Sequence, residues 1–132
     1  MFASAHAILD LTGQLSEFTT ANMLKWIKEA RKSGAIIKGD FLKRPQQWAN
    51  IVCGVPNKVQ YVDNILSANF ENPSVVTLDY LCNPDTNFHH FVRGWQKGGK
   101  CTYDPINYGN QGSNTAKGKN TFIESRRGYQ LL

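Results

Sequence analysis

The sequence lacks a long uncharged apolar run, and it does not begin with a basic stretch followed by an apolar one. A membrane-spanning helix needs about 20 predominantly apolar residues, and a secretory leader needs a basic start before its apolar segment. We therefore expect a soluble protein of a reducing cytoplasm, with no membrane among its partners.

Cysteine is also scarce. Cys53, Cys82 and Cys101 are an odd number of cysteines at wide, irregular spacing. A disulfide framework needs paired cysteines, and a structural zinc site usually shows closely spaced Cys and His ligands. The sequence thus predicts neither a disulfide scaffold nor a bound metal, and it indicates no organic cofactor.

Acidic residues are the minority charge, because 15 Lys and Arg face 10 Asp and Glu and give a net charge of +5. Part of the excess lies on one expected helix, at Lys25, Lys28, Arg31 and Lys32, and the rest lies late in the chain. Such an excess can attract nucleic acid through its phosphates. No ordered nucleic-acid-binding motif accompanies the charge, so we favour a solvated basic surface over a nucleic-acid partner.

The 132 residues suit a single domain, residues 1–132, with one core. Helix formers, capping residues and terminal glycines predict three helices in the first half. These are Ala3–Leu11, a helix from Thr19 or Thr20 to about Ser33, and a short helix from Pro45 to near Gly54. His6, inside the first helix, is expected to be a core or rim residue bonded to a neighbour.

The second half predicts strands, because branched and aromatic residues recur between turn signals. The expected strands are Val59–Asp63 at an edge, Ser74–Leu81, Asn87–Trp95, and Lys100–Pro105 after a Gln96–Gly99 turn, the last three as a meander. Residues 64–71 are ambiguous, Ile106–Asn120 predicts a surface loop, and Phe122–Ser125 with Tyr129–Leu132 would close the sheet as one interrupted strand or two short ones. The fold class is therefore α+β, with N-terminal helices packed on an antiparallel sheet.

The expected hairpin brings a histidine and an aspartate within reach of each other. Directly opposed residues of antiparallel strands lie about 4.5–5.5 Å apart at Cβ. A three-residue turn would pair Trp95 with Gly99 and His90 with Asp104, whereas a two- or four-residue turn would favour His89. We favour His90, since three-residue turns with a left-handed glycine are common. Without further context, the pair could also be a satisfied polar contact between strands.

His90-Phe91-Val92 and Asp104-Pro105, after a small-residue helix at the start of the chain, resemble motifs of the papain-like cysteine peptidases. The resemblance is to their compact bacterial branch, which includes double-glycine leader peptidases and cell-wall amidases. It implies a papain-like fold, with His90 as the catalytic base and Asp104 as the acid that orients it. It also implies a peptide or peptidoglycan amide as substrate, and no cofactor.

In that family the nucleophilic cysteine opens the first helix, in a Cys-Gly-Pro-x-Ser context. When Met1–Ser4 is laid over Gly-Pro-x-Ser, the nucleophile falls one position before Met1. The resemblance thus implies a cysteine peptidase or amidase, bacterial or phage, that is active if a cysteine precedes Met1 and inactive as written. A non-catalytic peptide- or protein-binding pseudopeptidase is the alternative, and a basic nucleic-acid or inhibitor-type binding protein is a third.

The cysteines within the chain are weaker nucleophile candidates. Cys53 precedes Gly54 in a Cys-Gly-x-Pro sequence, Cys82 is expected in the turn beside the histidine strand, and Cys101 is expected to face away from Asp104 by alternation. Free cysteines usually serve as small buried hydrophobic residues. We therefore expect none of the three to be catalytic.

Overall fold

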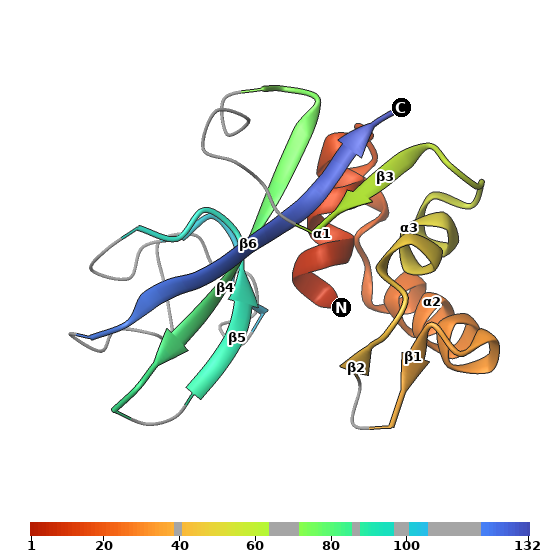
Figure 1. Cartoon of the computed structure of the whole chain (residues 1–132). Helices are drawn as coiled ribbons and strands as arrows, with labels where there is room; N and C mark the ends of the chain where they lie inside the picture. The colour runs from red at the N-terminus through yellow and green to blue at the C-terminus, as the bar shows by residue number, and fades with distance from the viewer. Residues whose placement is uncertain (39–40, 64–71, 86–87, 97–100, 106–119) are drawn as a thin grey trace.

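The computed structural model describes residues 1–38, 41–63, 72–85, 88–96, 101–105 and 120–132, and it has the predicted α+β class (Figure 1). The helices are α1 (Phe2–Leu11), the short 3₁₀ helix η1 (Leu15–Glu17), α2 (Thr20–Ser33) and α3 (Pro45–Cys53). The strands are β1 (Ile36–Ile37), β2 (Phe41–Leu42), β3 (Val59–Val62), β4 (Val75–Asn83), β5 (Phe88–Val92) and β6 (Phe122–Leu131). Over these residues, every helix is too short or too polar to cross a membrane.

The three predicted α-helices are confirmed, and local signals explain their ends. The side chain of Thr19 accepts a hydrogen bond from the backbone N–H of Asn22 at 3.2 Å and so caps α2. Gly34 and Gly54 end α2 and α3 in the left-handed region, with φ of 82° and 76°. Pro45 occupies the first turn of α3, where a missing N–H costs nothing.

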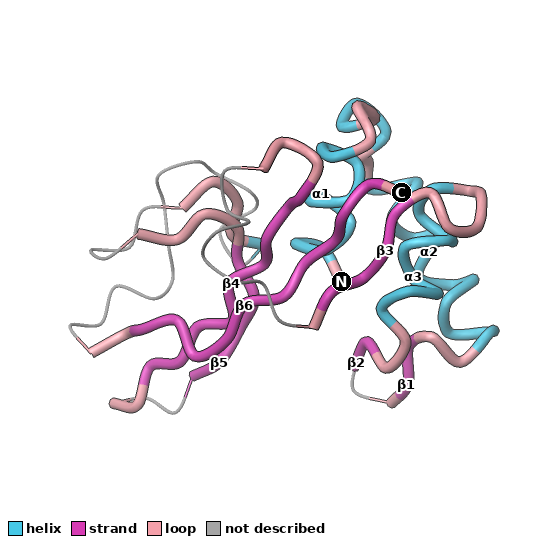
Figure 2. The backbone as a smooth tube through the Cα atoms, turned by 45° about the horizontal axis from the view of Figure 1, so that its top comes forward, coloured by secondary structure: helices cyan, strands magenta, loops and turns pink. Residues whose placement is uncertain are grey.

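The main sheet is antiparallel and has the order β3-β6-β4-β5, while β1 and β2 form a separate two-stranded ribbon. In Figures 1 and 2 the helices lie together toward the β3 side, and β5 forms the far edge. The prediction for the C-terminal segment was incomplete, because β6 is one continuous strand that pairs with both β3 and β4. The two arginines at its centre interrupt the hydrophobic pattern, but both have partners on the sheet: Arg126 donates to Asp79 and Arg127 lies over the Phe91 ring.

Only part of the predicted meander is present. β4 and β5 pair as expected, with Leu81 opposite His90. The third strand, predicted over Lys100–Pro105, is reduced to one bridge between Arg93 and Tyr103. The predictions for residues 64–71, for most of the turn at 96–99 and for the loop at 106–119 lie outside the described residues.

The sheet separates two apolar clusters. The larger one joins α1, α2 and α3 to one face of the sheet, and its most deeply buried large side chains include Trp48, Tyr129 and Ile8. Inside it, the Ser4 hydroxyl lies 2.8 Å from the Tyr129 hydroxyl, which in turn donates to the Pro45 carbonyl at 3.3 Å. This chain of hydroxyls ties α1, β6 and α3 together.

The smaller cluster is made by Leu81, Val92 and Cys101, with Trp95 and Ile123 packed against them. Because successive side chains of a strand point to opposite faces, Val92 and its neighbour Phe91 cannot share a cluster. Phe91 indeed packs against the larger cluster. The smaller cluster therefore lies on the face of the sheet that points away from α1.

Candidate functional site

The structure brings His90 and Asp104 together, as the hairpin predicted. The Nε2 atom of His90 lies 3.4 Å from Oδ1 and 3.5 Å from Oδ2 of Asp104, at the long end of the hydrogen-bond range. The His90 side chain is 10% exposed and the Asp104 side chain is fully buried. Burial lowers the pKa of His90, and the Asp104 charge opposes that shift only in part. The imidazole is therefore neutral near pH 7.

The register that brings them together differs from the predicted one. Arg93 pairs with Tyr103, whereas the prediction paired Trp95 with Gly99. The two registers differ by two residues, and a two-residue shift keeps every side chain on its face of the sheet. Asp104 therefore still meets His90, but it reaches the imidazole diagonally rather than from the directly opposite position.

The pair does not face the start of α1, and this corrects an expectation that the resemblance raised. Phe91 and Arg93 point toward α1, since Phe91 packs against the larger cluster and Arg93 binds α1 side chains. Alternation then places His90 on the opposite face, together with Val92. Catalytic roles for His90 and Asp104 stay a prediction, and their position does not favour a nucleophile at the start of α1.

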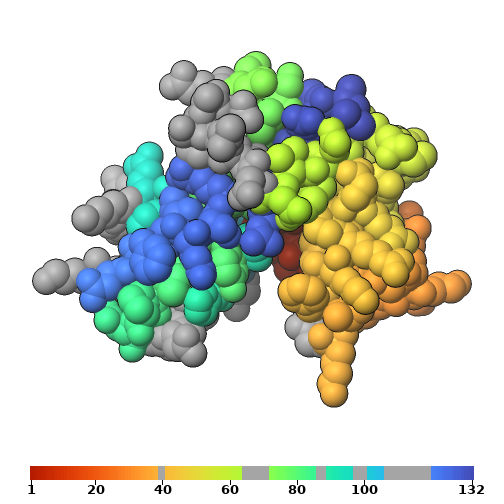
Figure 3. Space-filling view, viewed as in Figure 1, coloured from red at the N-terminus to blue at the C-terminus, as the bar shows by residue number. Residues whose placement is uncertain are grey.

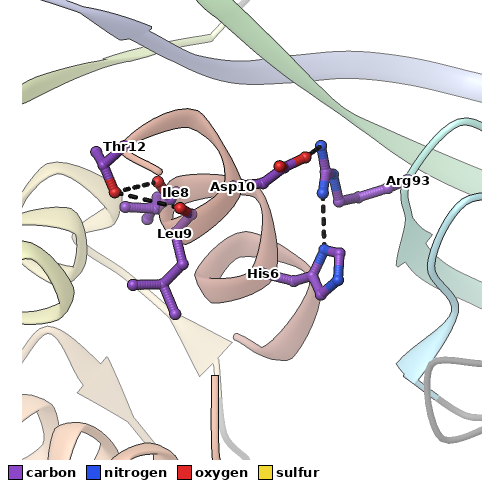
Figure 4. A network of polar contacts seen from close by, with 6 residues as sticks. All are labelled: His6, Ile8, Leu9, Asp10, Thr12 and Arg93. Carbon is purple, nitrogen blue, oxygen red and sulfur yellow. Dashed lines mark hydrogen bonds and ion pairs between the residues drawn. The ribbon is translucent and has the colours of Figure 1, made fainter. Parts of the chain in front are cut away.

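Arg93 is the residue that ties β5 to α1 (Figure 4). Its Nη1 donates to Nδ1 of His6 at 2.7 Å, and its Nη2 donates to Oδ2 of Asp10 at 3.0 Å. Tyr103 stacks on the His6 ring, with 4.2 Å between centroids. Burial, and then the Arg93 charge, lower the pKa of His6 to about 4, so the ring is neutral and can accept this hydrogen bond. The predicted core or rim position of His6 is confirmed.

The structure gives the three cysteines different surroundings. Cys53 is the last residue of α3 and lines a depression of about 450 Å³ between α2 and α3, and burial raises the pKa of its thiol. Cys101 is buried in the smaller cluster, where burial and the Asp104 charge raise its pKa to about 11. The prediction that Cys101 faces away from Asp104 was wrong, because strict alternation needs a regular strand and this segment has a single bridge.

Cys82 lies within β4 and not, as expected, in the following turn. Its Sγ is 3.9 Å from Nε2 of His89, the directly opposed residue of β5.

A pocket of about 200 Å³ opens at the start of α1. Figure 3 shows the red N-terminal segment at the bottom of a hollow between the blue and green sheet and the yellow and orange α2–α3 region. The walls are mainly apolar and aromatic, and they are supplied by α1, α3 and five of the strands. The lining residues are Met1, Ser4, Phe41, Leu42, Pro45, Tyr61, Leu78, Phe91, Arg127 and Tyr129.

Arg127 brings the positive charge of this pocket. Its guanidinium lies over the rings of Phe91 and Tyr80, 5.2 Å and 5.8 Å from their centroids, and its Nη2 donates to the Ser125 hydroxyl at 3.2 Å. The rings hold the planar group in place through cation–π contact. The Nε–H of Arg127 is buried and has no hydrogen-bond partner among the described residues. The pocket therefore has a positive charge in its wall, held in place by two aromatic rings.

This pocket could not be predicted from the sequence, because its walls come from seven elements and no local motif marks them. One signal was available: once His90 is placed on one face of its strand, Phe91 must occupy the other.

Comparison with protein-family models, with curated proteins and with solved structures finds no match for this chain. Its class therefore rests on geometry alone: it is an α+β protein with a mainly apolar pocket at the start of α1, and Arg127 of β6 lines that pocket.

Proposed function

We propose that the chain is a peptide-binding domain of papain-like ancestry. The ligand inserts an apolar side chain into the pocket at the start of α1, and one of its carboxylates meets Arg127. Support for the ancestry comes from the order of helices before sheet and from a pocket where the resembling family opens its first helix.

The observation that carries the proposal is the composition of the pocket wall on the sheet side. Tyr61, Leu78, Phe91, Arg127 and Tyr129 form it, and none of these side chains is a general base near pH 7. The imidazole that could serve as a base lies on the opposite face. Apolar walls with one fixed polar group are typical of binding sites, in which the polar group sets the orientation of the ligand.

The carboxylate preference follows from charge. An arginine recognises a carboxylate through two parallel hydrogen bonds, and Arg127 lines the pocket. The net charge of +5 also favours the approach of an acidic ligand. We expect a short segment in which a leucine or phenylalanine neighbours an aspartate, a glutamate or a free C-terminus.

The test is fluorescence anisotropy with labelled peptides that place leucine beside a carboxylate, against the same peptides as amides without acidic groups. Arg127→Gln should weaken binding of the acidic peptides about tenfold, as expected for the loss of a charge-assisted hydrogen bond. Lys28→Gln removes the same charge from an exposed position of α2 and should change the affinity less than about twofold. Equal effects of the two substitutions would show only nonspecific attraction and would refute the pocket.

The apolar half of the site has its own variant. Phe41 lines the pocket and is 61% exposed, so alanine can replace it without opening the core. Phe41→Ala should weaken acidic and amidated leucine peptides by the same factor, because it removes apolar contact that both ligands use. An unchanged affinity for both peptides would place the ligand elsewhere.

Amide cleavage is the second candidate, and the His90–Asp104 contact is the observation that favours it. This route requires His90 to reach the α1 face, as a one-residue slip of β5 would allow. In a chain carrying a cysteine immediately before Met1, His90→Ala should then abolish hydrolysis of a peptide amide, while His89→Ala should not. If the extended chain shows no hydrolysis, or if His90→Ala leaves hydrolysis unchanged, this candidate is excluded and the binding proposal is untouched.

A further inference from the structure

Three metal-binding side chains meet where the end of β4 lies between the starts of β5 and β6. Cys82 and His89 are directly opposed residues of β4 and β5, and Cys82 faces Phe122 of β6 on its other side. Glu124 comes from the same end of β6. The donor atoms of Cys82, His89 and Glu124 all lie within 4.8 Å of one another.

A β-bulge puts Glu124 into this group. Tyr80 pairs with Ser125 and Leu81 pairs with Ile123, so Glu124 is the extra residue between two regular pairs. In an unbroken ladder Glu124 would pair with Leu81 and point to the other face of the sheet. A bulge redirects the side chain of its extra residue, and bulges are frequent next to functional sites.

The Cys82–His89 distance is close to that between two ligands of one cation, whereas Glu124 lies nearest to the other ring nitrogen. The Sγ of Cys82 lies 3.9 Å from Nε2 of His89, and Oε2 of Glu124 lies 3.3 Å from Nδ1 of the same ring. Ligand atoms around a tetrahedral zinc are separated by about 3.3–3.6 Å, given zinc bond lengths of about 2.0–2.3 Å. Rotation of the Glu124 side chain, which is 48% exposed, can close the remaining gap to one ring nitrogen.

The His89 ring is held in place by a neighbouring ring and is accessible from solvent. Tyr80 stacks on the His89 ring, with 5.6 Å between centroids and 26° between planes, so the imidazole is oriented before any ligand arrives. The His89 side chain is 33% exposed, which leaves an entry path from solvent. Two ligands come from neighbouring strands in fixed register and the third comes from a bulge, so the backbone already sets their spacing.

We propose that Cys82, His89 and Glu124 bind a divalent transition-metal ion of the zinc class, with a fourth position open to water or to an external ligand. A thiolate with an imidazole selects zinc, cobalt or copper over magnesium and calcium, which prefer oxygen ligands. None of these three residues lines the pocket at the start of α1.

Cobalt(II) is the probe, because a cobalt–thiolate bond absorbs in the near ultraviolet and reports the sulfur ligand directly. Titration of the full chain should give a saturable band at one equivalent, which zinc displaces and excess magnesium does not. Cys82→Ser should remove the band. His89→Gln should weaken binding more than about 100-fold, because even outer partners of a metal ligand contribute about 10–100-fold.

Cys53→Ser is the matched control, since Cys53 is also a partly buried free thiol but has no place in the cluster. It should leave the band and the affinity unchanged. Glu124→Gln, on an exposed side chain that should not affect folding, should weaken binding about tenfold while keeping the thiolate band. The proposal is overturned if folded Cys82→Ser keeps the band, if Glu124→Gln leaves the affinity unchanged, or if wild type shows no saturable binding.

Discussion

His6 and His90 are both partly buried imidazoles whose pKa values are lowered, chiefly by burial. They nevertheless differ in their partners. His6 uses its neutral ring to accept a hydrogen bond from a cation, Arg93, whereas His90 lies beside an anion, Asp104. Protonation would place His6 against a like charge and His90 against an opposite one. Acid should therefore disrupt the His6 contact first among these two.

The stability of the fold should depend on the protonation of His6. Its folded pKa is about 4, below its usual value of 6.5, so the unfolded chain binds more protons between these pH values. The free energy of unfolding therefore falls as pH drops from 6.5 toward 4. His6→Asn keeps an acceptor for Arg93 but does not titrate, and it should remove about 1–2 kcal/mol of this loss, less than the full shift because the ring is partly exposed.

Urea unfolding of wild type and His6→Asn at about pH 7 and about pH 4.5 measures that difference. Carboxylates titrate in both proteins and cancel in the comparison. Parallel pH dependences in the two proteins would mean that His6 does not carry the linkage.

At the scale of elements, the helices could be predicted from sequence and the sheet only in part. Thr19, Gly34, Pro45 and Gly54 mark helix ends within a few residues of the helices they bound, so the signal is local. Strand pairing is not local. The order β3-β6-β4-β5 places the last strand of the chain inside the sheet, and no residue of β6 predicts that position.

Gly94 follows β5 with a left-handed backbone, and its substitution should destabilise the fold more than that of a helix-ending glycine. Its φ is 63°, and an added Cβ would overlap Oγ1 of Thr102, whereas Gly34, with φ of 82°, has open space around it. Gly34→Ala should cost about 1–2 kcal/mol for the left-handed backbone alone. Gly94→Ala should cost more, because Thr102 must also shift out of the bridge between Arg93 and Tyr103.

The second variant isolates the steric part. Thr102→Ala removes the overlapping hydroxyl but keeps a Cβ 3.2 Å from the added one, so Gly94→Ala in that background should cost only slightly more than Gly34→Ala in wild type. Chemical unfolding of wild type, Gly94→Ala, Thr102→Ala and the double variant gives the coupling energy between the two positions directly. If Gly94→Ala costs the same with and without the Thr102 hydroxyl, the left-handed backbone at Gly94 accounts for the whole loss of stability.

At the scale of the whole molecule, the two faces of the sheet separate the predicted site from the pocket. The proximity of His90 and Asp104 could be predicted, because a hairpin and alternation suffice for it. The pocket could not be predicted, because it depends on the position of β6 between β3 and β4, which places Arg127 over Phe91. The Cys82–His89–Glu124 group could not be predicted for a related reason, since Glu124 is distant in sequence from the other two and its position depends on a bulge.

This separation predicts that stability and ligand binding can be lost independently. Asp104→Ala removes a fully buried carboxylate beside His90 and should cost about 2–3 kcal/mol of unfolding free energy, because a buried polar contact is lost and a cavity is left. The folded fraction should bind acidic leucine peptides with wild-type affinity. Arg127→Gln, on the other face, should weaken binding about tenfold and cost less than 1 kcal/mol of stability.

The two variants together decide which face carries the function. Anisotropy titrations at a temperature where Asp104→Ala remains folded, combined with urea unfolding, give affinity and stability for each protein. If Asp104→Ala abolishes peptide binding while its unfolding free energy stays at the wild-type value, the ligand contacts the His90 face and the pocket at the start of α1 is not the site. If instead affinity follows Arg127 and stability follows Asp104, the buried pair supports the sheet and recognition belongs to the pocket.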